Sequence, residues 1–197
     1  QYPPKLWLRA RKGQAAQLAQ RLGNCKLSTD VPDAVEYLGT EDLFQRAEFR
    51  QGEFEIQDIG SQIVGHIANP QSGETWWDAC AGEGGKTLHL SDLMENEGLI
   101  WASDRAAWRI AKLKRRAARA RVFNYRAVAW EGSSKLPIRT KFDGVLVDAP
   151  CTGVGTWGRN PQARWTTTPQ GVEELAALQK QLLTNVAPSL KPSGKLV

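Results

Sequence analysis

The sequence predicts an α/β fold in which a mostly parallel sheet forms the main core and a small α+β module precedes it. Three observations support this prediction. Strand-like apolar segments alternate with helical segments from about residue 75 onward, at the spacing of βαβ units. A glycine-rich stretch separates the first of these strands from the helix after it. The first 52 residues, by contrast, contain only short apolar pieces and one amphipathic helix.

The predicted core begins with a helix over residues 57–68, whose isoleucine and valine side chains share one face. Strands are predicted after it at residues 75–80, 99–102, 122–129, 142–147 and 195–197. Helices are predicted between the strands at residues 86–94, 105–120 and 172–190. Right-handed crossovers then place one set of loops along a single edge of the sheet, at residues 80–86, 104, 131 and 148.

We expect the chain to form two units, residues 1–52 and residues 53–197. Residues 1–52 are predicted to form a small α+β module, with a strand at 6–8, a helix at 13–23 and apolar pieces at 35–38 and 44. The chain begins at Gln1, and its last residues resemble the opening of a strand. Both ends lead us to expect a fragment of a longer protein, with an incomplete core.

The amino-acid composition is that of a globular protein and disfavours a membrane span, a disulfide framework and a metal site. The 197 residues are 41% hydrophobic and 24% charged, as in globular domains. No run of about 18 apolar residues is present, so we expect no membrane span. Three cysteines without a CxxC pair favour a reducing cytoplasm over a disulfide framework. With two histidines and no cluster of cysteine and histidine, we expect no metal site.

The charge of the chain is positive and uneven. A formal net charge of +5 favours a polyanionic partner. Eight lysines and arginines lie between residues 105 and 121, within and just after one predicted helix. That segment has two interpretations, a solvated helix face or a contact with nucleic acid.

The segment Asp148-Ala149-Pro150-Cys151 follows the apolar run at residues 145–147. It therefore leaves the carboxyl end of a predicted strand, where ligands bind in open α/β sheets. An acid and a thiol at that place can act on a nucleobase, the acid by hydrogen bonding to the ring and the sulfur by adding to carbon or assisting proton removal. The alternative is a strand end with a buried structural cysteine.

The glycine-rich turn at residues 81–85 indicates a site for an anionic or sugar-bearing ligand, because backbone N–H groups are free there. A P-loop is excluded because Cys80 stands where its first glycine is required. A dinucleotide turn is excluded because Thr87 occupies the position of its third glycine. S-adenosylmethionine remains, with Asp104 at the next strand end for the ribose hydroxyls and Glu131 for the adenine amine. The alternative for each acid is a helix N-cap.

These residues form motifs that resemble the Sun-type RNA cytosine-C5 methyltransferases. The glycine motif of that family, D-x-C-A-x-P-G-G-K-T, is similar to residues 78–87, and its D-A-P-C-S-G-x-G motif is similar to residues 148–155 with Thr152 for serine. Its upstream Q-D-x-x-S motif matches residues 57–61. Order and spacing agree from residue 57 to residue 197, whereas residues 1–52 resemble the RNA-binding module of the family only through residues 6–9.

The resemblance implies a Rossmann-like, S-adenosylmethionine-dependent methyltransferase core. The residues that it implies for the cofactor are Cys80, Ala81, Gly82, Glu83, Gly84, Gly85, Lys86, Asp104, Arg109, Glu131 and Asp148. Two of these depart from the family pattern. Glu83 replaces the usual proline and adds a negative charge to the turn, and Glu131 stands where the family has aspartate.

The resemblance also implies the chemistry, which is formation of 5-methylcytosine in ribosomal or transfer RNA. A thiolate that adds to C6 of cytosine makes C5 reactive, and in this family the attacking cysteine belongs to a T-C motif that we expect beyond Val197. We therefore assign product release to Cys151, the cytosine edge to Asp148 and the wall of the active site to Lys86.

The substrate base has to be unstacked to reach such a site. Trp157, Arg159 and Arg164 follow the thiol loop, and we expect them to stack on bases or hold phosphates. Their alternative role is ordinary loop packing. The rival functions are a catalytically inactive RNA-binding paralogue and a methyltransferase acting on DNA cytosine. An adenine methyltransferase is disfavoured by Cys151, which that reaction does not need.

Overall fold

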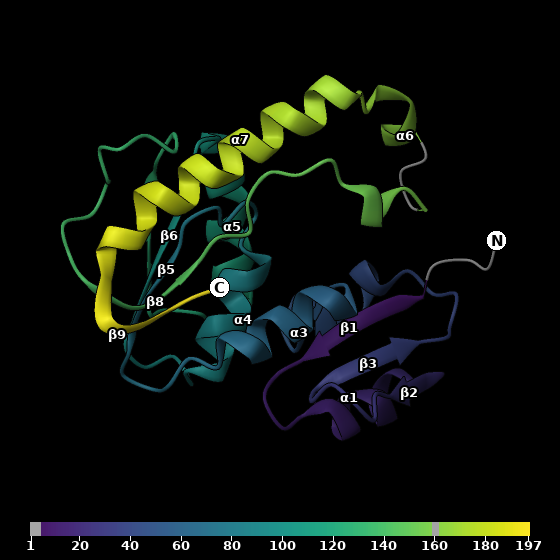
Figure 1. The fold of residues 1–197 in the computed structure, drawn as a ribbon. Helices are drawn as coiled ribbons and strands as arrows, with labels where there is room; N and C mark the ends of the chain where they lie inside the picture. Colours follow the sequence, from purple (N-terminus) through teal and green to yellow (C-terminus); the bar gives the residue numbers. More distant parts are fainter. Residues whose placement is uncertain (1–4, 159–161) are drawn as a thin grey trace.

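The computed structural model describes residues 5–158 and 162–197, which form two sheets (Figure 1). The larger sheet has the strand order β7-β6-β5-β8-β9, and every neighbouring pair in it is parallel. The smaller sheet has the order β2-β3-β1-β4 and is antiparallel. The predicted α/β fold with a small α+β unit before it is therefore confirmed.

The N-terminal sheet is built around β1 (Leu6–Ala10), its second strand from one edge. The other elements of this unit are α1 (Ala15–Leu22), β2 (Cys25–Leu27), β3 (Ala34–Tyr37), α2 (Ala47–Arg50) and β4 (Phe54–Ile56). Leu8, Leu18, Val35 and Phe54 form its buried core. Because β4 pairs with β1, this sheet extends past the predicted boundary at residue 52. The division of the chain into two independent units stays a prediction.

The parallel sheet follows the predicted alternation of strand and helix. Its elements are α3 (Ile59–Ala68), β5 (Thr75–Asp78), α4 (Gly85–Leu93), β6 (Leu99–Asp104), α5 (Ala107–Arg119), β7 (Tyr125–Ala129), β8 (Phe142–Leu146), α6 (Ala163–Thr166), α7 (Pro169–Val186) and β9 (Leu190–Leu196). The last strand begins five residues earlier than predicted, since its pairing with β8 shifts register between Leu190 and Lys195, and Pro192 is tolerated in such an irregularity.

Two adjacent tryptophans explain why both faces of this sheet are covered. Trp76 and Trp77 lie on the central strand β5, and both are fully buried. Trp76 packs with Leu90 and Met94 in one cluster, while Trp77 packs on the other face with Phe142. A central strand that is apolar on both sides needs helices on both sides, as in doubly wound α/β proteins.

The smaller sheet lies beside α3 at one side of the core, as Figure 1 shows. Within residues 5–158 and 162–197, no helix combines the length and the hydropathy needed to cross a bilayer. The same residues contain no group of three or more His, Cys, Asp or Glu side chains that could hold a metal ion.

Candidate functional site

The carboxyl ends of β5, β6, β7 and β8 open onto one cavity of about 600 Å³. The segments at the strand ends that line the cavity are residues 78–83, 85–86, 104–105, 130–132 and 148–151. Other parts of the chain complete the lining with residues 56–58, Ser61, Arg109, Arg116, Leu178 and Leu182. The expectation that the four loops share one edge of the sheet is therefore confirmed. The glycine turn and the thiol loop face the same space.

Gly84 is the one predicted cofactor residue that does not line this cavity. Its φ is +86°, and a Cβ on it would lie 2.6 Å from Cγ of Leu113. Only glycine allows the turn to pack this closely against α5. Gly84 thus packs against α5 on the side of the turn away from the cavity, while Gly82 and Gly85 line the cavity.

Asp104 joins the glycine turn to the beginning of α5. Its side chain is nearly buried, and Oδ2 accepts a hydrogen bond of 3.0 Å from the backbone N–H of Gly82. Oδ1 accepts another of 2.8 Å from the N–H of Ala106. Arg109 approaches Oδ2 to 3.8 Å. Each carboxylate oxygen can accept a further bond, so Asp104 is held in place with acceptor capacity left for a ligand that has two hydroxyls.

Asp78 is a cavity residue that the sequence interpretation quoted in a motif but assigned no role. Thr87 Oγ1 donates a hydrogen bond of 2.6 Å to its Oδ2. Its Oδ1 is buried and has no hydrogen-bond partner among the described residues. An orphaned buried acceptor in a cavity is unusual in native proteins. It fits a ligand that brings a donor, such as the ammonium group of an amino acid.

Burial raises the pKa of Asp78 from its ordinary value of 3.8 to about 7, aided by the charge of Asp148 and opposed by the Thr87 hydrogen bond and by Lys86. The folded protein therefore holds a proton that the unfolded chain releases above pH 3.8. We expect the free energy of unfolding to fall as pH rises from about 4 toward 7, by roughly 1 kcal/mol per pH unit at most from this group alone. Urea unfolding between pH 4 and 8 should show this slope reduced in Asp78→Asn; an identical slope in both proteins would contradict the prediction.

Lys86 connects the glycine turn to the thiol loop. Its Nζ lies 2.7 Å from Oδ2 of Asp148 and 3.4 Å from Oγ of Ser61. The lysine side chain is largely buried, whereas that of Asp148 is 55% exposed toward the cavity. The ion pair therefore orients the more accessible partner, Asp148, without covering it.

Two cysteines line the cavity, and they differ in environment. Cys80 is half-buried, and burial raises its pKa to about 12, with a further rise from the acids around it. It therefore remains a thiol at neutral pH. Cys151 is exposed at the end of the Asp148 loop. A reactive thiolate needs access, so Cys151 is the better placed of the two for chemistry.

The side of the cavity near Glu131 is apolar. Trp130, Leu178 and Leu182 line it, and the sequence did not identify any of them as site residues. Trp130 comes from the end of β7, next to the predicted acid, but the leucines come from α7, whose approach depends on tertiary packing. Glu131 itself is exposed. An apolar wall beside a carboxylate suits a flat heterocycle with an amino group.

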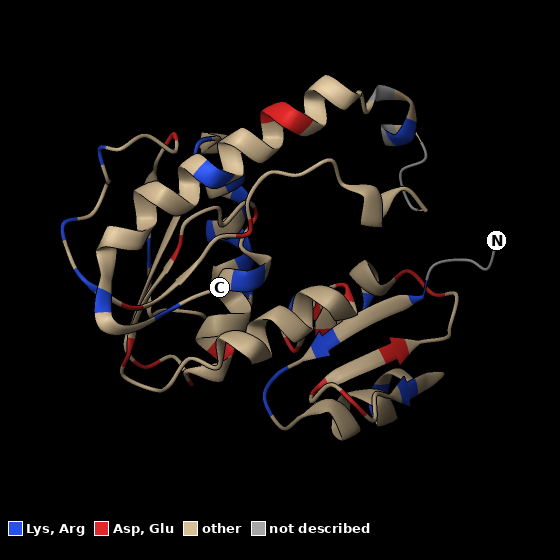
Figure 2. Ribbon diagram, in the orientation of Figure 1, with Lys and Arg blue, Asp and Glu red and all other residues tan. Residues whose placement is uncertain are grey.

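The charge that Glu83 adds to the turn is balanced by α5. Its carboxylate lies 2.7 Å from Nζ of Lys112. Lysine and arginine recur along α5 (Figure 2). Arg116 and Arg119 pair with Glu55, while Lys114 and Arg115 are exposed. Both interpretations of this basic segment, solvated face and RNA contact, therefore stay open for its exposed cations.

Of the predicted RNA-binding residues, Trp157 and Arg164 do not line the cavity. Trp157 is half-buried, and its indole N–H has no partner among the described residues. Arg164 is exposed and lies over the ring of Trp165, 5.8 Å from its centroid. Arg159 lies outside the described residues. Their role in RNA binding stays a prediction.

Comparison with known proteins decides the family. The family 16S rRNA methyltransferase RsmB/F matches residues 66–197, which is most of the chain and includes the glycine turn and the thiol loop. The chain belongs to the RsmB/F methyltransferase family. The resemblance found in the sequence motifs is thereby confirmed.

Relatives of this RsmB/F chain support the same conclusion. Probable ribosomal RNA small subunit methyltransferase B of Synechocystis sp. is 37% identical over 196 residues, covering 94% of this chain and 43% of that protein. Mouse tRNA (cytosine(72)-C(5))-methyltransferase NSUN6 is 33% identical over 155 residues, covering 72% of this chain and 32% of that protein. The chain thus spans less than half the length of these curated relatives.

A solved structure gives the same fold. NSun6 from Pyrococcus horikoshii, determined with SFG, an analogue of S-adenosylmethionine, superposes with a TM-score of 0.86. The match covers 98% of this chain and 74% of the other, at 19% sequence identity. The Rossmann-like methyltransferase fold of this family member is therefore established.

Proposed function

We propose that the chain binds S-adenosylmethionine in the cavity and that the full-length protein transfers its methyl group to C5 of cytosine in ribosomal or transfer RNA. One observation carries this proposal. The glycine turn with its neighbouring acids and the loop that bears Asp148 and Cys151 line one cavity, and the Lys86–Asp148 ion pair joins them. The three unpaired cysteines are consistent with the cytoplasmic location that such a reaction implies.

The cavity residues fit this cofactor. Asp78 Oδ1 offers an acceptor for the ammonium group, and Asp104 offers its remaining acceptor capacity to the ribose hydroxyls. Glu131 and Trp130 flank the place proposed for adenine. When bound, the cofactor supplies an electrophilic methyl group. The chain itself supplies the charges and hydrogen-bond acceptors that hold it.

The remaining residues act on the base. We assign Asp148 to the N3 edge of cytosine, where a carboxyl group stabilises the charge that develops on the ring. Lys86 holds Asp148 in place. After methylation, a base removes the C5 proton and the attacking thiolate leaves. We assign assistance in this release to Cys151, and the attack itself to the cysteine of a T-C motif expected after residue 197.

The proposal is tested with the full-length protein, tritium-labelled S-adenosylmethionine, and transcripts of 16S rRNA and of tRNA. We expect label in 5-methylcytosine after digestion to nucleosides, and no label in DNA of the same sequence. RNA that is bound but never labelled would identify an inactive RNA-binding protein. Labelling of DNA in preference to RNA would replace this proposal with the DNA alternative.

The assignment of Cys151 has a test of its own. RNA that carries 5-fluorocytosine traps the covalent adduct, because no proton is available at C5 for removal. We expect Cys151→Ala to form this adduct in the full-length protein, and to accumulate an adduct on unmodified RNA as well, since release is slowed. Denaturing gels report both species. A variant that forms no adduct on either RNA would make Cys151 the attacking residue.

A further inference from the structure

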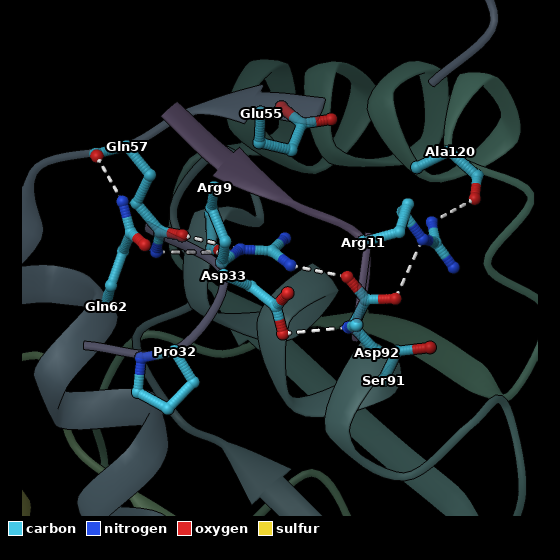
Figure 3. Close-up of polar contacts among 12 residues, drawn as sticks. Arg9, Arg11, Pro32, Asp33, Glu55, Gln57, Gln62, Ser91, Asp92 and Ala120 are labelled. Atoms are coloured by element: carbon cyan, nitrogen blue, oxygen red, sulfur yellow. Dashed lines mark hydrogen bonds and ion pairs between the residues drawn. The ribbon is translucent and has the colours of Figure 1, made fainter. Parts of the chain in front are cut away.

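A buried charged network joins the N-terminal sheet to the cofactor turn. It begins at Arg9 on β1, whose side chain is only 3% exposed. Figure 3 shows this side chain directed between Gln57 and Asp92. Its Nη1 lies 2.5 Å from Oδ2 of Asp92, and its Nε donates a hydrogen bond of 2.8 Å to Oε1 of Gln57. Arg11 holds the other oxygen of Asp92 at 2.7 Å.

This first connection reaches both ends of α4. Asp92 lies in the last turn of the helix, and Gly85 is its first residue. Gln57, which accepts from Arg9, donates through Nε2 to the carbonyl oxygen of Gly85 at 3.3 Å. The backbone of Gln57 is itself tied to the N-terminal sheet, because its N–H donates to the carbonyl of Trp7. Arg9 and Gln57 together set where α4 begins relative to β1.

A second connection reaches the same turn from β4. Glu55 is 4% exposed, and its Oε2 lies 2.9 Å from Nη2 of Arg116. Arg119 binds the other oxygen of Glu55. Arg116 then uses Nη1 to donate a hydrogen bond of 3.1 Å to the carbonyl oxygen of Glu83. The two connections therefore bind two carbonyls of one turn, those of Glu83 and Gly85.

The arrangement has a consequence for ligand binding. Carbonyls that are bound by Arg116 and Gln57 are held in fixed directions, which fixes the orientation of the peptide groups in the turn. Buried ion pairs contribute little net stability compared with apolar side chains of the same volume. A network of two buried acids and four arginines is therefore better explained by the geometry that it imposes than by the stability that it adds.

We propose that Glu55, Arg9, Gln57 and Arg116 are positioning residues for the cofactor turn, through which the N-terminal sheet sets the affinity of the core for S-adenosylmethionine. The inference rests on the proposed function. Glu55 and Arg9 do not line the cavity, so they act through Arg116 and Gln57. Glu55 and Gln57 thus support the cofactor turn, and β4 (Phe54–Ile56) is at the same time the last strand of the smaller sheet.

The test compares two buried acids of the same sheet. Glu55→Gln weakens the ion pairs to Arg116 and Arg119, whereas Glu36→Gln weakens a pair with Lys5 that does not reach the turn. Binding of S-adenosylhomocysteine is measured by calorimetry with full-length protein, and unfolding by urea. We expect Glu55→Gln to raise Kd about tenfold, as an imperfectly preorganised site does, and Glu36→Gln to leave Kd unchanged.

Two further readouts separate positioning from general destabilisation. Hydrogen exchange in residues 80–88 should speed up in the ligand-free Glu55→Gln protein, and the KM for S-adenosylmethionine should rise while kcat at saturation stays the same. If Glu55→Gln does not fold, Gln57→Glu replaces it, because it keeps an acceptor for Arg9 but cannot donate to Gly85. Equal Kd and equal exchange in variant and wild type would overturn this inference but leave the proposed function standing. Wild-type protein that binds no S-adenosylhomocysteine would overturn the proposed function and this inference together.

Discussion

Replacement of Asp148 by alanine is expected to lower the rate of cytosine methylation by about 10²- to 10³-fold, the usual cost of removing a group that stabilises developing charge. Affinity for S-adenosylhomocysteine should fall far less than the rate, because Asp104, Asp78 and the turn amides remain as cofactor contacts when Asp148 is removed. Single-turnover methylation by the full-length protein measures the first quantity, and calorimetry measures the second.

The geometry around Asp148 explains why the loss should fall on the chemical step. Lys86 Nζ, at 2.7 Å from Oδ2, fixes the carboxylate, yet more than half of the side chain stays open to the cavity. Asp148→Asn keeps an oxygen for Lys86 but cannot offer a carboxyl group to the base, so it should be as slow as the alanine variant. An Asp148→Asn protein with normal turnover would assign Asp148 to holding Lys86, and the cytosine edge would need another residue.

The parallel sheet could be predicted because apolar strand segments alternate with helical segments at the spacing of βαβ units, and because its central strand β5 is apolar on both faces. The two shortest strands of the N-terminal sheet, β2 and β4, could not be predicted. β2 has two exposed residues of its three, and β4 reads Phe-Glu-Ile, too short to show a period. β4 exists because its backbone pairs with β1, and that pairing is a long-range contact with no local signal.

The same reasoning separates the site residues that were predictable from those that were not. Asp104 ends a parallel strand, and Cys80, Glu131 and Asp148 each follow one by two residues, so topology alone brings them to one edge. The glycine turn is also held by Gln57 and Arg116. Gln57 precedes α3, although the sequence placed it in that helix, and Arg116 belongs to α5, for which the sequence predicted a helix but no contact with the turn. Their convergence on two carbonyls depends on how the smaller sheet packs on the core, which no local pattern encodes.

Glu83 shows a further limit of sequence reasoning. Its replacement of the usual proline was expected to add a negative charge beside the cofactor. In the structure Lys112 neutralises that charge, and Arg116 binds the carbonyl of the same residue. The charge that Glu83 adds is thus compensated by two cations of α5 that lie four residues, about one turn, apart on the same side of the helix.

Asp104→Ala should weaken the binding of S-adenosylhomocysteine by about 100-fold, because hydrogen bonds to a charged, nearly buried acceptor contribute roughly 1.5–3 kcal/mol. The variant also leaves the N–H groups of Gly82 and Ala106 without an acceptor. Part of the loss therefore comes from the cofactor contacts and part from a turn that is no longer held in shape. Calorimetry gives the affinity, and urea unfolding gives the stability that is lost with those two hydrogen bonds.

Asp143 provides the matched control for Asp104. It too accepts a backbone hydrogen bond and pairs with a cation, but it lies near the amino end of its strand, away from the cavity. Its Oδ2 accepts a hydrogen bond of 2.9 Å from the N–H of Thr75, and its Oδ1 pairs with Lys191. Asp143→Ala should therefore destabilise the fold while leaving Kd for S-adenosylhomocysteine unchanged. If both variants lost affinity to the same degree, the effect of Asp104 would be one of stability, and the ribose would have to be bound elsewhere. A loss confined to Asp104→Ala places the cofactor at the carboxyl ends of β5 and β6.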